Sequence, residues 1–586
     1  MGKRWRIKPH DVGQVMQLER AAQVPPVVAQ LLVHRGIVTR ERAADFLEAR
    51  MSDLRDPASL PGMDEAASAI FAAVSDKKKI TIYGDYDADG MTATGILVRC
   101  LTLLGADVNY YVPNRLDEGY GLSAEALQKL ANRGTQMVVT VDCGIASVSE
   151  AQVASELGLE LVITDHHTPG AELPAARAIV HPGLASAPYP FPGLCGAGVA
   201  FKLAWALCRR ASNATKVTPR LKNFLVTAMG LAAMGTVADV VPLVDENRVL
   251  VRHGLNSLKV SPVLGVAELM RVASIDSKPT LSSEDIGFVL GPRLNAAGRL
   301  GQAQLGVELL TTESSDRARA LAEYIHQLNN SRDSLERSIY LAATKQIKEQ
   351  FDPINDPALV LAGHGWHSGV IGIVAGRLAE KHARPVVMIA LDELGAVPGT
   401  GSARSANGLN LHQALAACDE HLISYGGHAA AAGLRIDAAH VERFRDHFCE
   451  YVSTEVAPED RVEDLYIDAE APLLQLTLST VTQIEQLAPF GQANPRPVLC
   501  AMGVSLDGPP RRMGSGERHM TATFRQHSVS VRGVAFGQGD WVEQMEQTPG
   551  AIDIAYRPVI NEFRGRRNVE IHLVDWRPSD RTSPSS

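Results

Sequence analysis

Three carboxylates fall within five residues in the segment Asp85-Tyr86-Asp87-Ala88-Asp89-Gly90, directly after the apolar run Ile80-Thr81-Ile82-Tyr83. Like charges this close repel one another unless a cation neutralises them, and hard divalent cations take oxygen ligands. The end of a strand is also where α/β sheets keep their chemistry. Taken alone, the segment fits an acidic surface turn or a calcium-like loop as well as it fits a catalytic metal site.

Two further apolar runs end in residue types that bind metals. Asp142 follows Val138 to Val141, and Asp165-His166-His167 follow the run that ends at Thr164. Three strand-like segments with such ends favour a metal site over a surface turn. Asp239 interrupts the apolar run from Met234 to Pro242. Taken alone, it could be a helix cap or a turn carboxylate instead of a metal ligand. The candidate metal ligands are Asp85, Asp87, Asp89, Asp142, His166, His167 and Asp239.

The chemical types of these residues indicate the metal. Carboxylates with one or two imidazoles suit Mn²⁺ or Mg²⁺ better than a structural zinc ion, which would prefer cysteines. The set is large enough for two ions about 3.5–4 Å apart with a bridging carboxylate. Such a pair activates water and stabilises the attacking and leaving oxygens at phosphorus.

The elements that must position these residues are predicted from apolar periodicity. Short β-rich runs alternate with helical patterns from about residue 78 to 182, which indicates βαβ units and a parallel sheet. Residues 196–310 are mainly helical in pattern, and residues 315–350 predict a connecting helix or an interrupted pair of helices. A second α/β unit is expected from strands at 359–362 and 385–391. From about residue 460, short alternating runs predict a small β-barrel or sandwich.

Composition limits the classes of protein that remain. A chain of 586 residues should hold several domains, because single cores stop growing near ~250–300 residues. With no run of eighteen apolar residues, no membrane span is predicted. Seven scattered cysteines indicate free thiols in the cytoplasm. The net charge of −9 argues only weakly against nucleic-acid binding, since a basic groove can coexist with an acidic exterior.

The motifs resemble a known superfamily. Asp165-His166-His167, after the D-x-D-x-D-G segment, resembles the DHH phosphoesterase superfamily, and residues 426–433 are similar to the G-G-H-x-x-A-A-G signature of its DHHA1 domain. The order of the motifs over about residues 30–575, with Gly291–Arg299 among them, resembles the RecJ family of bacterial single-strand-specific 5′→3′ DNA exonucleases. The resemblance implies metal-dependent hydrolysis of DNA phosphodiesters to 5′-mononucleotides, in DNA repair and recombination.

The resemblance also implies an architecture. It is an α/β fold with a parallel-sheet DHH domain, a long connecting helix, a smaller α/β DHHA1 domain and a C-terminal OB-fold β-barrel. The expected parts are an N-terminal helical segment (1–70), the catalytic DHH domain (71–312), the connecting helix (313–352), the substrate-binding DHHA1 domain (353–458), the DNA-binding OB domain (459–577) and a disordered tail (578–586).

Roles carried over from the superfamily refine the ligand set. Related pyrophosphatases place a histidine where this chain has Tyr83, and Asp85 is the natural substitute. Asp165 is expected to hydrogen-bond the backbone or a histidine rather than metal. His167 is implied as a ligand or as a contact to the scissile phosphate. The implied metal ligands are Asp87, Asp89, Asp142, His166 and Asp239, with Asp89, Asp142 and His167 as the catalytic residues.

Substrate-binding residues are expected mainly in the second α/β unit. Gly426-Gly427-His428 can bring N–H groups and an imidazole against a phosphate, although a plain turn followed by a tight helix is the alternative. Ser402 and Arg404 could grip a 5′-terminal phosphate. His364 and His367 are expected to contact substrate or pack a loop rather than bind metal. Other candidates along the DNA are Arg115, Arg293, Asn295 and Arg299.

The C-terminal β region combines arginines with aromatic residues, as single-strand-binding OB-folds do, although arginine-rich hairpins are also common solvated faces. The residues are Arg511, Arg512, Arg518, His519, Arg557, Arg564, Arg566 and Arg567, with Phe524, Phe536, Tyr556 and Phe563.

Three functions are compatible with these features. The first is a single-strand 5′→3′ exonuclease that acts on DNA with a free 5′ end, works with a helicase and a single-strand-binding protein, and is a monomer. The second is a DHH-type phosphoesterase of short oligonucleotides, cyclic dinucleotides or pyrophosphate, which would not need the β-barrel. The third is a non-catalytic single-strand-binding scaffold, which the intact acids and histidines disfavour.

Overall fold

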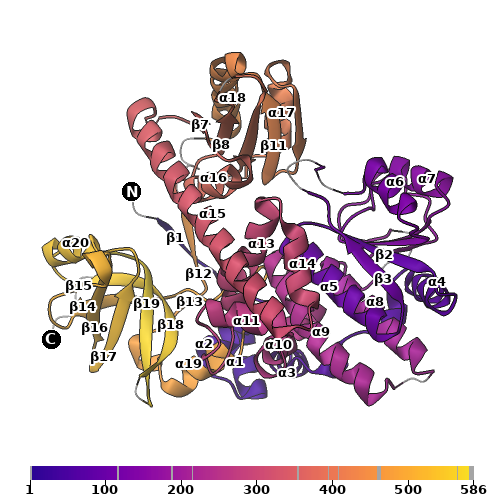
Figure 1. Ribbon diagram of the computed structural model, residues 1–586. Coiled ribbons are helices and arrows are strands. Elements are labelled where there is room, and N and C mark those ends of the chain that lie inside the picture. Colours follow the sequence, from indigo (N-terminus) through magenta and orange to yellow (C-terminus); the bar gives the residue numbers. More distant parts are fainter. Residues whose placement is uncertain are drawn as a thin grey trace. The chain divides into compact units, whose positions relative to one another are not determined.

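The computed structural model describes residues 3–114, 118–119, 121–185, 189–213, 216–352, 355–393, 395–406, 408–457, 463–563 and 565–579 (Figure 1). The chain folds into two compact units. One comprises Met1–Asp53, Pro242–Val244 and Glu463–Ser586, and the other comprises Leu54–Val241 and Asp245–Val462.

The larger unit contains the predicted parallel sheet. Its strands are β2 (Lys79–Gly84), β3 (Asp107–Tyr111), β4 (Met137–Val141), β5 (Glu160–Thr164) and β6 (Ala178–Val180), and they lie in the order β3-β2-β4-β5-β6 with every pairing parallel. After β2 the chain adds β3 on one side, and it then returns to add β4 on the other. The boundary between β2 and β4 is therefore the topological switch point, outside which α/β sheets bind ligands.

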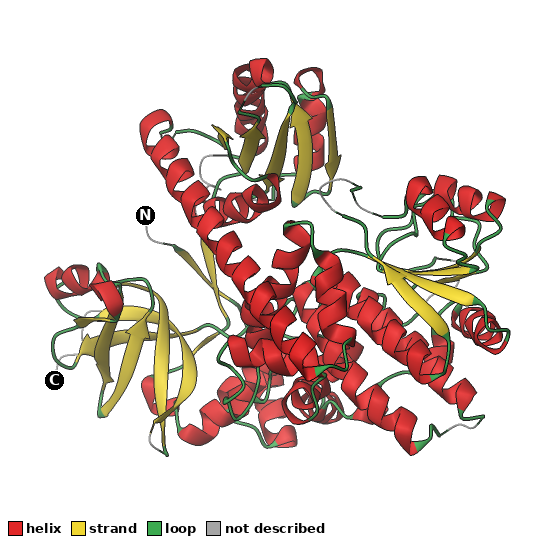
Figure 2. Ribbon diagram, viewed as in Figure 1, coloured by secondary structure: helices red, strands yellow, loops and turns green. Residues whose placement is uncertain are grey.

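Helices cover both faces of this sheet (Figure 2). Because β2, β4 and β5 are buried on both faces, they read as continuous apolar runs rather than alternating ones. On one face lie α6 (Ala124–Asn132) and α7 (Val148–Glu156), and on the other α4 (Met63–Ser75), α5 (Ala88–Leu103) and α8 (Gly196–Ala211).

A helical layer follows, as the sequence predicts for residues 196–310. It contains α9 (Pro219–Ala238), α10 (Asp245–Val260), α11 (Leu264–Val272), the short α12 (Ser283–Asp285) with the π-helical turn η3 (Ile286–Leu290), α13 (Gly291–Arg299) and α14 (Ala303–Thr311). The connecting helix α15 (Ser315–Gln350) is one continuous helix of 36 residues, so the interrupted pair is wrong. It packs against α11, α13 and α14 and then against α16 (Ser368–His382) of the next domain.

Helix α9 is unusually long and apolar, although no membrane span is predicted from the sequence. Among the described residues, α9 alone is long and apolar enough to cross a membrane by length and composition. In the structure 61% of its most apolar window is buried, and it packs against α5, α8 and α10. A helix that is apolar on most sides is also what a large core requires.

The second α/β domain of this unit has a mixed sheet in the order β10-β11-β9-β8-β7. One alternative fails here: the alanine run after His428 leads into a strand rather than a tight helix. The elements are β7 (Leu359–His364), α16 (Ser368–His382), β8 (Val386–Leu391), β9 (Gly399–Arg404), α17 (Leu411–Ala417), η4 (Asp419–His421), β10 (Ser424–Gly427), β11 (Ala431–Ile436), η5 (Ala438–His440) and α18 (Val441–Glu455).

The smaller unit joins the first residues of the chain to the last. Strand β1 (Arg4–Ile7) pairs in parallel with β12 (Asp464–Ile467). The buried side chains of α1 (Val12–Ala22), α2 (Pro26–Val33) and α3 (Arg40–Glu48) share one hydrophobic cluster with α19 (Leu478–Glu485) and the C-terminal sheet. The N-terminal helices, expected as a segment of their own, are thus part of this unit's core.

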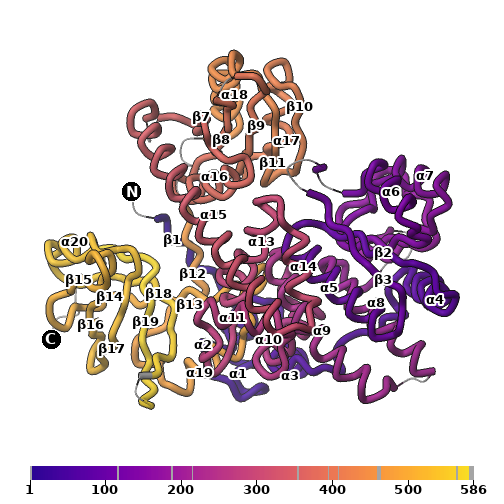
Figure 3. Tube along the Cα trace, viewed as in Figure 1, coloured from indigo at the N-terminus to yellow at the C-terminus, as the bar shows by residue number. Residues whose placement is uncertain are grey.

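The C-terminal sheet closes into a barrel, whose path Figure 3 traces. The strands pair in the ring β14-β18-β19-β17-β16 and back to β14, with β17 and β19 parallel. A closed five-stranded barrel of this kind is the predicted OB-fold. Its elements are β13 (Ala469–Glu470), β14 (Leu499–Leu506), β15 (Arg511–Met513), β16 (His519–Gln526), β17 (Val529–Ala535), α20 (Trp541–Gln547), β18 (Ile552–Phe563) and β19 (Arg566–Pro578). Residues 580–586 of the expected disordered tail lie outside the described residues.

Candidate metal centre

The carboxyl ends of three adjacent strands bring the predicted ligands together. The segments after β2, β4 and β5 meet at one edge of the sheet, at the switch point. Three overlapping groups of donor atoms lie there, and within each group all donor atoms are within 4.8 Å of one another. The groups are Asp85 with Asp87 and Asp142; Asp142 with His166 and His167; and Asp89 with His166 and Asp239, which together include all seven predicted ligands.

The acidic segment is held by its own helix and by α13. Asp87 is the N-cap of α5, and its Oδ1 accepts hydrogen bonds from the backbone N–H groups of Asp89 (2.8 Å) and Gly90 (3.0 Å). The side-chain oxygen of Asn295 accepts a 2.8 Å bond from the N–H of Ala88. A Cβ at Gly298 would lie 2.1 Å from the backbone oxygen of Tyr86, so α13 touches the acidic segment directly.

Asp89 is fixed by the amino end of α8, a contact that the sequence analysis missed. Its carboxylate is 1% exposed and accepts hydrogen bonds from the N–H groups of Gly196 (2.6 Å) and Ala197 (2.9 Å). A helix N-terminus stabilises such a charge. Cβ atoms added at Gly196 or Gly235 would lie 2.5 Å from Asp142 or 2.3 Å from Asp89. Glycines inside otherwise apolar helices were the signal available in the sequence.

Asp165 organises the two histidines. Its Oδ1 accepts hydrogen bonds from the N–H groups of His166 (2.7 Å) and His167 (3.1 Å) and lies 2.8 Å from Nδ1 of His167. Its Oδ2 accepts a 2.9 Å bond from the N–H of Ile145. The carboxylate is therefore committed to the backbone and to one imidazole, which is the role expected for it, and it lies in none of the donor groups.

The donor atoms of the centre face one another at short distances. Nε2 of His166 lies 3.1 Å from Oδ1 of Asp142 and 3.5 Å from Oδ2 of Asp239. Among the described residues, that nitrogen and Oδ1 of Asp85 are buried and accept or donate no hydrogen bond. Buried polar atoms are nearly always satisfied. Oxygen and imidazole donors that converge in this way fit Mn²⁺ or Mg²⁺.

Tyr83 takes no part in this arrangement. Its ring lies 5.2 Å from that of Tyr111, and its hydroxyl donates a 3.0 Å hydrogen bond to the backbone oxygen of Gly121. Asp85, two residues further on, lies with Asp87 and Asp142. Asp85 therefore lies among the donor atoms of the centre, whereas Tyr83 does not.

Burial and mutual repulsion change the protonation of these groups. Burial, with the neighbouring carboxylates second, raises the pKa values of Asp85 and Asp142 well above the usual range and that of Asp239 to about 8. Burial alone would lower the pKa of His167, but the hydrogen bond to Asp165 and the charges of Asp165, Asp239 and Asp85 together outweigh it and raise the pKa to about 9. A divalent cation would replace these protons.

The first prediction concerns pH. As the pH falls below about 8, protons compete for Asp239, so Mn²⁺ affinity should weaken by roughly tenfold per pH unit for each proton displaced. A raised carboxyl pKa means that the folded state holds a proton that the unfolded chain has released. The metal-free protein should therefore lose stability as the pH rises from 3.8 toward about 8.

Calorimetric Mn²⁺ titrations and thermal unfolding across this range measure both effects. Asp239→Asn, which removes the titration but keeps the shape, is the matched variant and should show a flatter pH dependence. Equal pH dependence of the two proteins would contradict the prediction.

The arginines of α13 that are expected to bind DNA donate hydrogen bonds to backbone oxygens. The guanidinium of Arg293 donates to the oxygen of Val289 (2.7 Å) and lies 3.3 Å from Nδ1 of His326. Arg299 donates a 3.0 Å bond to the oxygen of Gly369, at the first turn of α16. Helix α13 thereby links the acidic segment to the second α/β domain. Arg115 lies outside the described residues.

The phosphate-binding candidates of the second domain occupy three neighbouring strands. Ser402 of β9 pairs with Gly433 of β11, which pairs with Gly426 of β10. Arg404 is opposite Ala431 and donates to Oγ of Ser402 (3.1 Å). The turn between β10 and β11 carries the exposed His428, and Gly427 adopts a φ of +135° that favours glycine.

His364 and His367 are not grouped with other metal donors among the described residues. His367 is the N-cap of α16, where its Nδ1 accepts a 3.1 Å bond from the N–H of Gly369. Nδ1 of His364 lies 2.9 Å from the backbone oxygen of Asp392. Both contacts agree with loop packing.

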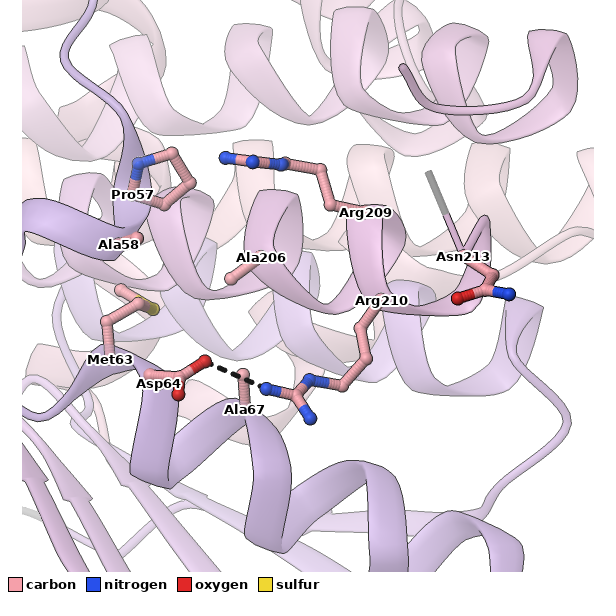
Figure 4. Close-up of a pocket in the computed structure, with 9 residues that line it drawn as sticks. All are labelled: Pro57, Ala58, Met63, Asp64, Ala67, Ala206, Arg209, Arg210 and Asn213. Atoms are coloured by element: carbon pink, nitrogen blue, oxygen red, sulfur yellow. Dashed lines mark hydrogen bonds and ion pairs between the residues drawn. The ribbon is translucent and has the colours of Figure 1, made fainter. Parts of the chain in front are cut away.

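A surface pocket between α4 and the end of α8 offers no comparable chemistry (Figure 4). Its two arginines are already paired: Arg210 lies 2.8 Å from Asp64, and Arg209 lies 2.6 Å from Asp56. The rest of its lining is small and apolar or a single amide: Pro57, Ala58, Met63, Ala67, Ala206 and Asn213.

In the barrel the aromatic residues divide into two kinds. Phe524 and Tyr556 are fully buried core residues, so their expected exposure for base stacking is wrong. Phe536 is 57% exposed, and its ring centroid lies 5.5 Å from that of His519 and 5.0 Å from that of His572.

The arginines of the barrel are mostly exposed. Arg512 forms an ion pair with Glu543. The exposed arginines are Arg511, Arg518, Arg557, Arg566 and Arg567. Arg564 and the side chain of Phe563 lie outside the described residues.

Comparisons with known proteins match all three predicted domains. Models of the DHH family N-terminal domain, the DHHA1 domain and the RecJ OB domain match residues 79–233, 355–454 and 467–575. The single-stranded-DNA-specific exonuclease RecJ of Bacillus subtilis (strain 168) is 38% identical over 573 residues, which are 98% of this chain and 70% of the relative.

Solved structures agree as well. The crystal structure of RecJ in complex with Mn²⁺ from Thermus thermophilus has a TM-score of 0.82 and 32% identity, and the match covers 100% of this chain and 80% of that one. For the complex with Mg²⁺ from the same organism, the TM-score is 0.75 at 30% identity, with 100% and 79% of the two chains covered.

Proposed function

The chain belongs to the RecJ family of single-stranded-DNA-specific exonucleases, and from that premise we propose how its own residues perform the reaction. It is a metal-dependent exonuclease of single-stranded DNA, a hydrolase that uses Mn²⁺ or Mg²⁺. The observation that carries the proposal is the convergence of seven donors at the switch point of the sheet.

The three overlapping groups would hold two divalent ions, and Asp142 and His166 each belong to two of the groups. When bound, the ions lower the pKa of water and neutralise charge at the scissile phosphate. Asp165 fixes His167, because its Oδ1 lies 2.8 Å from Nδ1 of that imidazole. Nε2 of His167 is then left to bind an ion or to contact a phosphate oxygen of the substrate.

Polarity and products follow from the second α/β domain. Arg404 and the turn at Gly426-Gly427-His428 bind a 5′-terminal phosphate, so that cleavage proceeds 5′→3′ and releases 5′-mononucleotides. The parts expected from the sequence act as catalytic (71–312), connecting (313–352), substrate-binding (353–458) and DNA-binding (459–577) domains. The enzyme acts as a monomer in the cytoplasm, on strands that a helicase exposes and a single-strand-binding protein covers.

The short-substrate phosphoesterase is the second candidate, and the closed barrel argues against it, because a barrel with exposed arginines binds a strand longer than a dinucleotide. One assay separates the candidates: degradation of 5′- and 3′-labelled single- and double-stranded DNA with and without Mn²⁺. Loss of the 5′ label as mononucleotide from single strands alone is expected. Cleavage of dinucleotides but not of long strands would overturn the proposal, as would no cleavage at all.

A second prediction tests the barrel. Phe536→Ala should weaken binding of long single-stranded DNA by roughly 10–100-fold, because base stacking on an aromatic ring contributes ~1–3 kcal/mol. The matched control is Tyr466→Ala, since Tyr466 is equally exposed (59%) but lies on β12 outside the barrel. Fluorescence anisotropy at one salt concentration measures both. Equal affinities of the two variants would remove Phe536 from the DNA-binding surface.

A further inference from the structure

A second cluster of metal-binding side chains lies in the α/β domain that carries Arg404. It consists of Glu420 and His421 in η4 and His447 in α18. Nε2 of His421 lies 3.4 Å from Nδ1 of His447, and Oε1 of Glu420 lies 3.7 Å and 3.6 Å from these two nitrogens. The three donor atoms form a nearly equilateral triangle.

The size of this triangle matches one face of a tetrahedral metal site. Zinc binds imidazole nitrogen at about 2.0–2.1 Å and carboxylate oxygen at about 2.0–2.2 Å, so two ligands at the tetrahedral angle are about 3.3–3.6 Å apart. The observed sides are 3.4, 3.6 and 3.7 Å. Ligands at right angles in an octahedral site would be closer, at about 3.0 Å for the same bond length.

We propose that Glu420, His421 and His447 form a site for a first-row transition ion of the zinc class, separate from the catalytic centre. Two imidazoles with one carboxylate suit such an ion better than Mg²⁺, whereas the carboxylate-rich centre at the sheet suits Mg²⁺ or Mn²⁺. The fourth position is open to water or to His440 of η5, whose ring centroid is 6.5 Å from that of His421.

The site joins two parts of the fold. His421 lies just before β10, and His447 lies in the middle of α18, whose Phe444 and Phe448 fill the core beneath. An ion held by both would tie the segment that enters the β10–β11 hairpin to the helix behind it. That hairpin carries Gly426-Gly427-His428, so the ion would have a structural role in positioning the turn. The metal site itself does not depend on the exonuclease activity.

Zinc content tests the proposal in the full-length protein. The protein is stripped with a chelator, equilibrated with excess Mg²⁺ to occupy the carboxylate centre, and titrated with ZnCl₂. The wild type should bind one more zinc ion than His421→Ala or His447→Ala, measured by elemental analysis after gel filtration. His412→Ala is the control, because His412 lies in the same domain but is not one of the three proposed ligands. Its ring centroid is 5.9 Å from that of Tyr425.

Two further measurements keep the test decisive. Thermal unfolding in chelator should be the same for all four proteins, whereas added zinc should stabilise the wild type and His412→Ala more than the other two variants. Anomalous scattering at the zinc edge should place an ion between His421 and His447. Equal zinc content in all four proteins, or no anomalous peak there, would overturn the proposal and leave a hydrogen bond between the two imidazoles as the explanation of their contact.

Discussion

Replacing His166 with alanine is expected to lower the turnover number for single-stranded DNA by at least about 1,000-fold without unfolding the protein. Its Nε2 belongs to two donor groups, one with Asp142 and the other with Asp89 and Asp239. Removing it therefore weakens both ion positions at once. Lewis-acid stabilisation is worth several kcal/mol, and each ~1.4 kcal/mol is tenfold in rate.

The effect should be measured as single-turnover hydrolysis of a short oligonucleotide with the enzyme in saturating excess over the DNA and at one fixed Mn²⁺ concentration, so that loss of DNA affinity does not contribute. His382→Ala is the matched control: His382 is half-buried at the end of α16 and belongs to none of the donor groups. Calorimetry should show weaker Mn²⁺ binding in His166→Ala only. Wild-type turnover of this variant would refute the assignment of the metal centre.

Much of the fold could be predicted because its central strands are buried on both faces. Such strands appear in the sequence as apolar runs bounded by polar residues, and β4 contains the whole run from Val138 to Val141 that precedes Asp142. The metal centre could be predicted from the same pattern, because acids stand at the ends of the apolar runs. Asp85, Asp142 and Asp165 each come directly after a run, and the ends of parallel strands must lie side by side.

The contacts that escaped prediction join residues far apart in the sequence. Strand β1 pairs with β12 over a separation of 460 residues, and the short basic sequence of β1 carries no periodic signal. Asn295 reaches the acidic segment, and Gly196 reaches Asp89, through side-chain and backbone groups whose partners the local sequence does not specify.

Side-chain direction was the other source of error. Alternation along a strand shows that one face is buried, but it does not show which. Phe524 and Tyr556 were expected to face DNA and instead fill the barrel, and Tyr556 donates a 2.6 Å hydrogen bond to the oxygen of Ala471. Among the candidate stacking residues whose side chains the structure describes, Phe536, just after the end of β17, is the exposed one.

The polarity of the enzyme should depend on Arg404. A chain of direct contacts leads to it from the acidic segment: Gly298 lies against Tyr86, Arg299 bonds Gly369, and a Cβ at Gly372 of α16 would lie 3.0 Å from the Arg404 guanidinium. A terminal phosphate bound by Arg404 is thereby kept at a fixed distance from the metal centre. An exonuclease that starts at a 5′ end must bind that end at a fixed distance from its metal centre.

Arg404→Ala is therefore expected to slow cleavage of 5′-phosphorylated oligonucleotides by roughly 10–100-fold, because a hydrogen bond to a charged group contributes about 1.5–3 kcal/mol. Cleavage of 5′-hydroxyl oligonucleotides should change much less, so the ratio between the two substrates should fall. The control is Arg443→Ala, an exposed arginine on α18, which packs on the other face of the same sheet. Both substrates should be short and compared at one salt concentration, since backbone contacts vary with ionic strength. If the ratio is the same in Arg404→Ala as in the wild type, the 5′ end is bound elsewhere.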